Sequence, residues 1–390
     1  MVLNSPQLAT RLTQIQPFYA MSLMARAREL QAAGRDVINM GVGEPDFDTP
    51  PPIVAAGIAA LQQGRHHYTP ACGLLALREA ISEYYADHFS VDVDPRRILI
   101  TPGSSGALQL LMQCLINPGD QVLMTDPGYP CNRNFVRLVE GEAVTIPVCS
   151  EDNYQLNLPL LQPHWGPRSK ALLLASPSNP SGTLVGSEDL KAMAAFVAQQ
   201  RGHLFVDEIY QGLCYEGAVQ TALSVSDELF VINSFSKFFG MTGWRLGWLV
   251  APEAYVEALE RVAQNVFLSA PTPAQYAALA AFTPETMTIL EQRREEFQCR
   301  RDYLLPALKS LGFEIDYVPQ GAFYLYANCH ALTEDSFNFA HRLLEETAVA
   351  VTPGKDFGHY LPQHYLRFSY TSSLPRLEQA IARVAQFLKK

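Results

Sequence analysis

Short apolar, β-rich runs between residues 97 and 252 constrain the fold of this chain more than any other feature. Several alternate with helical patterns, such as GALQLLMQCLI (106–116) and SEDLKAMAAFVAQQ (187–200). Apolar strands that alternate with helices are typical of a parallel sheet covered on both faces. We therefore predict an α/β fold with a mostly parallel seven-stranded sheet sandwiched by helices. The seven runs are RILITP, DQVLMTD, EAVTIPV, KALLLAS, HLFVDEIY, ELFVIN and RLGWLVAP.

The 390 residues are too many for one ordinary core and suggest a second, smaller domain. After residue 284 a long charged helix begins, of a length that suits a domain connector. Strand-like FEIDYV, GAFYLYA and YLRFSY follow, with helices SFNFAHRLLEET and PRLEQAIARVAQFL, which predicts an α+β unit. We expect an N-terminal segment (1–47) packed with this small domain, a large domain (48–284) and a small domain (285–390). The Pro-rich DFDTPPP (46–52) is expected to be an extended turn.

Charge and cysteine content limit the classes of partner. The net charge is −10 without a basic patch, which argues against nucleic acid and favours a small molecule. The seven cysteines are widely spaced without a CxxC pair, and the nine histidines lack metal-ligand spacing, so we expect neither disulfides nor a metal site. No leader-like segment or run of eighteen apolar residues occurs. A cytoplasmic protein without membrane insertion is expected.

Two segments suggest a phosphate-binding site. The strand-like ELFVIN is followed by Ser234, Ser236 and Lys237, with Arg245 eight residues beyond the lysine. The PGSSGAL turn places Ser104 and Ser105 at the start of a helix, where amides and the helix dipole favour an anion. An arginine can grip a phosphate with two hydrogen bonds. Taken singly, each segment is also compatible with an ordinary loop or a serine N-cap.

Further polar residues follow other predicted strands. Asp207, Glu208 and Tyr210 end the HLFV strand and should project over the same rim of the sheet. If the ligand is a pyridine, a carboxylate there would keep its ring nitrogen protonated, and a phenol could hydrogen-bond to its 3-oxygen. Asn179 lies in SPSNPSGT, where Asn-Pro is also ordinary turn chemistry. Strand-end acids can equally be solvated.

A carboxylate site is suggested by two other segments. The GVGEPDFDTP loop offers backbone N–H groups near Gly43. Arg367 lies within the otherwise apolar YLRFSY, and a half-buried arginine needs an anionic partner. The alternative for Arg367 is an exposed strand face.

Together these segments resemble the class I and II aminotransferases of the pyridoxal-phosphate fold type I superfamily, essentially from end to end. The pieces stand in the family's order: GEPDFDTP, HYTPACGLLALREA, PGSSGAL, DPGYP, SPSNPSGT, VDEIY, SFSKFFGMTGWRLGW and LRFSY.

The resemblance implies the cofactor pyridoxal 5′-phosphate and a role for each matching residue. Lys237 matches the lysine that forms the internal aldimine and then shuttles a proton. Asp207 matches the partner of the pyridine nitrogen, while Tyr210 and Asn179 match the contacts to O3′. The phosphate cup is matched by Ser104, Ser105, Ser234 and Arg245, with Ser236 nearby.

Other matches concern the substrate and a second subunit. Tyr129 matches the aromatic ring that stacks on the cofactor, and Arg367 with the Gly43 amide matches the clamp on the substrate's α-carboxylate. Tyr68 matches a tyrosine that reaches the neighbouring subunit's phosphate, which implies a homodimer. No motif supplies the second cation that family members preferring dicarboxylic substrates need, so the substrate stays open.

The expected function is transfer of an amino group between an L-amino acid and a 2-oxo acid by a ping-pong mechanism. A carbon–sulfur β-lyase on the same scaffold remains an alternative, because the same carbanion can eliminate a β-substituent. A ligand-sensing regulator with an aminotransferase-like domain is a more distant alternative, since only about forty residues precede GEPDFDTP and the chain is acidic.

Overall fold

A seven-stranded sheet forms the centre of the larger body. The structure, a computed structural model, describes residues 7–15, 18–216 and 220–389. The strand order is β2-β8-β7-β6-β5-β3-β4, and all neighbours are parallel except β8, which runs antiparallel to β2 and β7. This confirms the predicted α/β fold and the seven strands. They are β2 (Ile98–Thr101), β3 (Gln121–Asp126), β4 (Glu142–Pro147), β5 (Ser169–Ala175), β6 (His203–Asp207), β7 (Phe230–Ser234) and β8 (Gly247–Val250).

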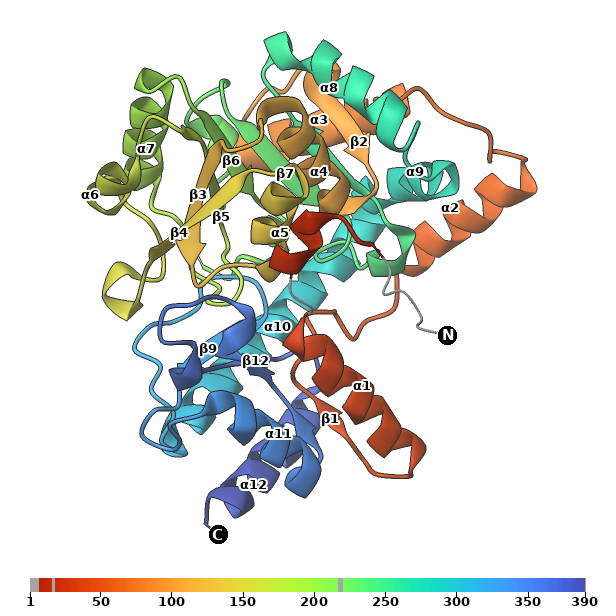
Figure 1. The fold of residues 1–390 in the computed structure, drawn as a ribbon. Coiled ribbons are helices and arrows are strands. Elements are labelled where there is room, and N and C mark those ends of the chain that lie inside the picture. The colour runs from red at the N-terminus through yellow and green to blue at the C-terminus, as the bar shows by residue number, and fades with distance from the viewer. Residues whose placement is uncertain (1–6, 16–17, 217–219, 390) are drawn as a thin grey trace, which may run out of the picture.

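Helices cover both faces of this sheet (Figure 1). Along β5, Leu172 and Leu174 belong to one buried cluster while Leu173 belongs to the other. Alternate side chains of a strand point to opposite faces, so a sheet buried on both sides needs apolar residues throughout. The helices are α2 (Pro51–Gln62), α3 (Leu75–Phe89), α4 (Gly103–Leu115), α5 (Pro130–Leu138), α6 (Leu158–Leu161), α7 (Ser187–Gln199), α8 (Glu253–Val266) and α9 (Thr272–Leu279).

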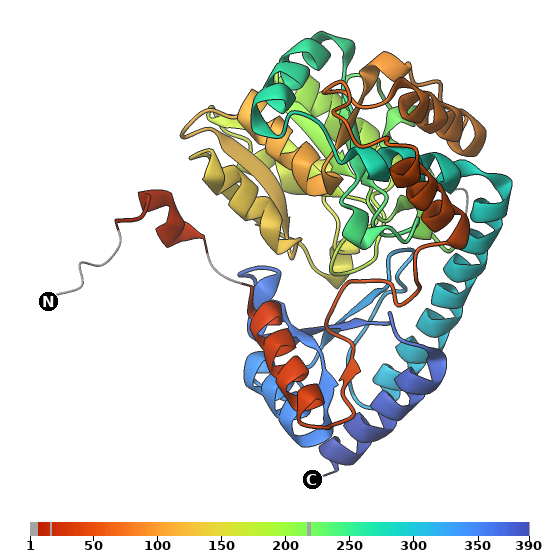
Figure 2. The ribbon, with the colours of Figure 1, turned by 90° about the vertical axis from the view of Figure 1, so that its right-hand side faces the viewer.

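A smaller body follows the long helix α10 (Pro284–Ser310), which runs along one side of the molecule from the first body to the second (Figure 2). Its sheet is antiparallel in the order β11-β12-β9, formed by β11 (Thr352–Pro353), β12 (Tyr365–Ser369) and β9 (Tyr324–Asn328). Helices α11 (Ser336–Thr347) and α12 (Leu374–Leu388) complete it. The N-terminal α1 (Tyr19–Ala32) and β1 (Ile38–Asn39) also lie here, since β1 pairs with β10 (Val349–Ala350).

Two local expectations differ from the structure. The segment FEIDYV buries Phe313 and Ile315 as a strand would, but it forms only an isolated bridge between Glu314 and Asn328. Alternation of buried and exposed side chains alone therefore does not ensure that a segment pairs with a neighbouring strand. In DFDTPPP, Pro51 begins α2, because proline has no N–H to lose in the first helical turn.

No helix in the described part of the chain combines the length and the apolar character that crossing a membrane requires.

The start of α4 approaches β8 so closely that only glycine fits at Gly247. A Cβ there would lie 2.8 Å from the carbonyl carbon of Gly103 and 2.9 Å from the amide nitrogen of Ser104. We expect Gly247→Ala to destabilise the protein by about 1–3 kcal/mol, because backbone atoms of β8 and α4 would have to separate. Gly166→Ala is the matched control, since its Cβ would meet nothing within 4 Å. A melting temperature of Gly247→Ala equal to that of the control would contradict this account.

Candidate active site

Parallel pairing brings the loops after β5, β6 and β7 to one edge of the sheet. Ala175 lies opposite Asp207, and Asp207 lies opposite Ile232, so the three strands end close together. A cavity of about 800 Å³ lies at this edge. It brings together most of the residues singled out in the sequence, namely Gly43, Ser104, Ser105, Tyr129, Asn179, Asp207, Tyr210, Ser236, Lys237, Arg245 and Arg367.

The amine of Lys237 lies within this cavity. Its Nζ donates a hydrogen bond to the Gly43 carbonyl at 2.6 Å. The pKa of Lys237 is lowered to about 8, mainly by burial; Arg367 and Arg245 also lower it, whereas Glu44 and Asp207 raise it. A lysine with such a pKa is partly neutral near physiological pH and can act as a nucleophile.

An anion-binding corner is formed by α4 and the loop after β7. Ser104 and Ser105 occupy the first turn of the thirteen-residue α4, and Arg245 lies so close that a Cβ on Gly103 would be 2.7 Å from its Nη2. Ser236 lines the same corner and donates its backbone N–H to Ser234 Oγ at 3.0 Å. Helix N–H groups, hydroxyls and a guanidinium together form a site for a phosphate.

Asp207 and Glu208 have different environments although they are neighbours. Asp207 lines the cavity, accepts the Ile209 N–H at 3.1 Å, and has a pKa raised to about 6 by burial. Glu208 does not project over the rim as expected. It binds the Thr221 hydroxyl at 2.9 Å and the Ala222 N–H at 2.6 Å, so it fixes a loop instead.

Tyr324 is a residue of this site that the sequence analysis missed. It lines the cavity from β9, and its hydroxyl lies 2.8 Å from that of Tyr210. Its ring packs against the Arg367 guanidinium, with 4.1 Å between the guanidinium carbon and the ring centroid. Tyr324 also explains why residue 43 is a glycine, because any Cβ there would collide with the Tyr324 hydroxyl. The sequence offers one signal for this residue, which is a tyrosine within an apolar strand. A buried phenol needs a hydrogen-bond partner, so such a tyrosine can be expected to face another polar group.

Arg367 is buried in this cavity and forms no salt bridge in the described part of the chain. Its side chain donates to Asn179 Oδ1 at 2.8 Å and to the Gly41 carbonyl at 2.7 Å. Its Nε is buried and makes no hydrogen bond. A buried guanidinium needs an anion to offset its loss of hydration. Arg367 and Asn179 therefore form a site suited to a carboxylate.

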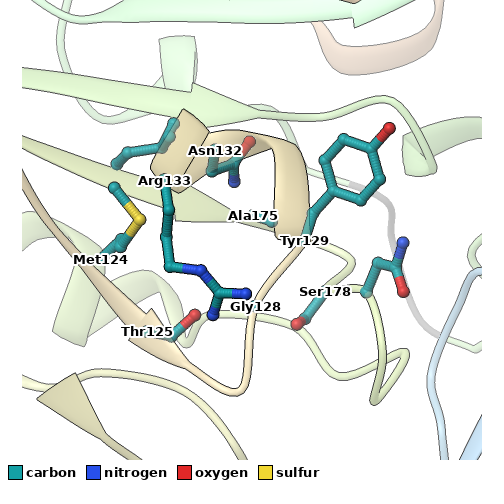
Figure 3. Close-up of a pocket in the computed structure, with 10 residues that line it drawn as sticks. Met124, Thr125, Gly128, Tyr129, Asn132, Arg133, Ala175 and Ser178 are labelled. Carbon is teal, nitrogen blue, oxygen red and sulfur yellow. The ribbon is translucent and has the colours of Figure 1, made fainter. Parts of the chain in front are cut away.

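Tyr129 precedes α5 and lines the main cavity. It also lines a second, small cavity of about 10 Å³ (Figure 3). There the Arg133 side chain extends toward Thr125 and Gly128 rather than toward the Tyr129 ring. Arg133 donates to the carbonyls of Asp356 and Phe357 at 3.0 and 3.2 Å. These two hydrogen bonds connect α5 to the segment that carries Asp356.

Two of the proposed cofactor contacts do not line the cavity. Ser234 is buried below Ser236, and its hydroxyl donates to the Leu246 carbonyl at 3.1 Å. Tyr68 is 81% exposed in the loop between α2 and α3. Tyr68 therefore has no role within the cavity of its own chain.

The cavity thus combines a lysine amine of lowered pKa, a corner of donors suited to a phosphate, a buried carboxylate and a buried arginine suited to a carboxylate. Residues 35–384 match the family model of aminotransferase class I and II. The chain is 38% identical to a (5-formylfuran-3-yl)methyl phosphate transaminase of Methanocaldococcus jannaschii over 98% of this chain and 100% of that protein.

Two further comparisons agree. The chain is 36% identical to a valine–pyruvate aminotransferase of Mycobacterium tuberculosis, over 96% of this chain and 97% of that one. A crystal structure of an aminotransferase from Mycobacterium tuberculosis superposes with a TM-score of 0.94 at 35% identity, covering 99% of this chain and 100% of that one. The chain therefore belongs to the class I and II aminotransferase family.

Proposed function

We propose that this aminotransferase binds pyridoxal 5′-phosphate through Lys237 and exchanges an amino group between an L-amino acid and a 2-oxo acid in a ping-pong reaction. The observation that carries the proposal is the Lys237 amine, which has a lowered pKa and shares its cavity with two guanidiniums, Arg245 and Arg367. The cofactor would supply an aldehyde that accepts the amino group and a ring that withdraws electrons. The names of the relatives differ in substrate, so they support the reaction but not one amino acid.

The residues present fit this cofactor. A buried carboxylate at Asp207, whose pKa burial raises, gains a favourable partner when a protonated ring nitrogen lies beside it. The hydroxyls of Ser104, Ser105 and Ser236, with Arg245, would hold the phosphate, and Ser234 would orient Ser236. Tyr210 and Asn179 would contact the ring's 3-oxygen, and Tyr129 would pack on its face.

The substrate would be held by its α-carboxylate. Arg367, with its unpaired Nε, and the Gly43 backbone would bind that group, and Asn179 would orient the guanidinium. Lys237 Nζ, once free of the cofactor, would remove and return the proton at the substrate's Cα. Uptake of the amino group by the cofactor, rather than release of ammonia, separates this reaction from a carbon–sulfur β-lyase.

We further propose that a homodimer completes the site in the cytoplasm. The exposed Tyr68 would reach the phosphate bound by the second copy. The odd number and wide spacing of the cysteines support a reducing compartment.

Replacing Lys237 tests the assignment of the amine. We expect Lys237→Ala to lose the visible absorbance of the covalently held cofactor and to lower kcat by more than about a thousandfold, because no other amine would replace it. The exposed Lys191→Ala is the matched control and should keep both properties. An unchanged spectrum in Lys237→Ala would exclude this lysine.

The lowered pKa predicts a pH dependence of cofactor capture. Only the neutral amine reacts, so the rate at which cofactor-free protein takes up pyridoxal phosphate should fall about tenfold per pH unit below about 8 and level off above it. An unperturbed lysine would level off only above about 10.4. Stopped-flow absorbance between about pH 7 and about pH 11 would show the midpoint.

Glu44 provides a second test of the same titration. Its charge raises the pKa of Lys237, so Glu44→Gln should move the midpoint of cofactor capture to lower pH. A shift upward would contradict the electrostatic account.

Tyr324 is expected to act as a positioning residue for two neighbours. Tyr324→Phe removes the hydrogen bond to Tyr210 but keeps the ring against Arg367. We expect kcat to fall roughly three- to tenfold with little change in KM, since one hydrogen bond contributes about 1 kcal/mol. Tyr324→Leu should also raise KM. Tyr360→Phe, at a partly exposed site outside the cavity lining, is the control. Equal effects of both Tyr324 variants on KM would contradict this division of roles.

A further inference from the structure

Helix α1 provides an apolar wall of the cavity. Met21 and Met24 line it from one side of the helix, three residues apart, and Phe18 lines it from the extended residue just before the helix. The Phe18 ring lies 6.4 Å from the Tyr129 ring, measured between centroids. The wall therefore reaches the tyrosine proposed to pack on the cofactor.

A buried carboxylate fixes this wall in place. Asp356 Oδ1 accepts the Tyr19 N–H and Oδ2 accepts the Ala20 N–H, both at 2.7 Å. Asp356 is 4% exposed and also lines the cavity. The first turn of α1 is thus held next to the site by its own unpaired amides, and a negative charge accompanies it.

Among the described residues of this chain, the cavity lining leaves no cation for a second substrate carboxylate. Within the described part of the chain, the lysines and arginines that line it are Lys237, Arg245 and Arg367, and each has a proposed partner. Arg133 is nearby, but its guanidinium binds the carbonyls of Asp356 and Phe357. The remaining charged residues of the lining are acidic, namely Glu44, Asp207 and Asp356.

We infer that the amino-acid substrate carries an uncharged, largely apolar side chain that packs against Phe18, Met21 and Met24. This inference rests on the aminotransferase function proposed above. Asp356 and Glu44 would repel a distal carboxylate, whereas an aromatic, thioether or large aliphatic side chain would bury apolar surface against the wall. The methionines are flexible and polarizable, so the wall can adapt to more than one such shape.

A single-turnover comparison tests the substrate class. The holoenzyme is mixed with phenylalanine, methionine, leucine, aspartate or glutamate, and conversion of the cofactor is followed by its visible absorbance. We expect kcat/KM for the best apolar amino acid to exceed that for aspartate and glutamate by at least about 100-fold. Equal or faster conversion by either acid would overturn the inference while leaving the proposed function intact. Conversion by no amino acid would overturn the proposed function itself.

Binding of unreactive acids provides a readout that does not depend on turnover. The holoenzyme is titrated calorimetrically with 3-phenylpropionate and with succinate, which share one carboxylate and differ at the other end. We expect 3-phenylpropionate to bind at least about tenfold more tightly, because succinate would bring a second charge toward Asp356. Tighter binding of succinate would contradict the apolar site.

Variants of α1 locate the contact. Met24→Lys, and Met21→Lys at a 61% exposed position that tolerates charge, should lower the phenylalanine-to-aspartate ratio of kcat/KM at least about tenfold. Ala25→Lys adds the same charge on the same helix at an exposed position outside the cavity lining, and it should leave the ratio unchanged. If folded Met21→Lys and Met24→Lys both keep the wild-type ratio, α1 does not contact the side chain and the inference fails.

Discussion

Parallel pairing of β5, β6 and β7 is the constraint on which the site depends. The ladder that sets Ala175 beside Asp207 and Asp207 beside Ile232 ends three strands at one edge. Loops carrying Asn179 and Lys237 therefore begin next to Asp207, although these residues are far apart in the sequence. The close contact of β8 with α4 at Gly247 then adds the proposed phosphate-binding corner to the same edge.

Most of this arrangement could be predicted because the central sheet is buried on both faces. Leu172, Leu173 and Leu174 enter the two apolar clusters alternately, so β5 appears in the sequence as an uninterrupted apolar run. Where such a run ends in a polar residue, as at Asp207, the carboxyl edge of the sheet can be located before any contact is known. The polar residues that follow the strands could then be placed together with some precision.

The remaining features depend on contacts that a local pattern does not record. Glu208 follows Asp207 directly but turns toward Thr221 and Ala222, because an adjacent loop offers donors there. Tyr324 meets Tyr210 only because the smaller body packs against the larger one. For the segment FEIDYV, the local pattern predicts more structure than forms. It has the burial pattern of a strand, but no neighbouring strand pairs along its length.

The two guanidiniums that we propose to bind anions also influence the Lys237 amine. Arg245 and Arg367 both lower the pKa of Lys237, in addition to the larger effect of burial. In the proposed reaction, a phosphate beside Arg245 and a carboxylate beside Arg367 would neutralise these charges, so the pKa of the amine would rise as the two sites fill. By linkage, each anion binds more tightly when the amine is protonated. On this proposal, the same residues would favour a neutral nucleophile before the ligands arrive and a stronger base once they are bound.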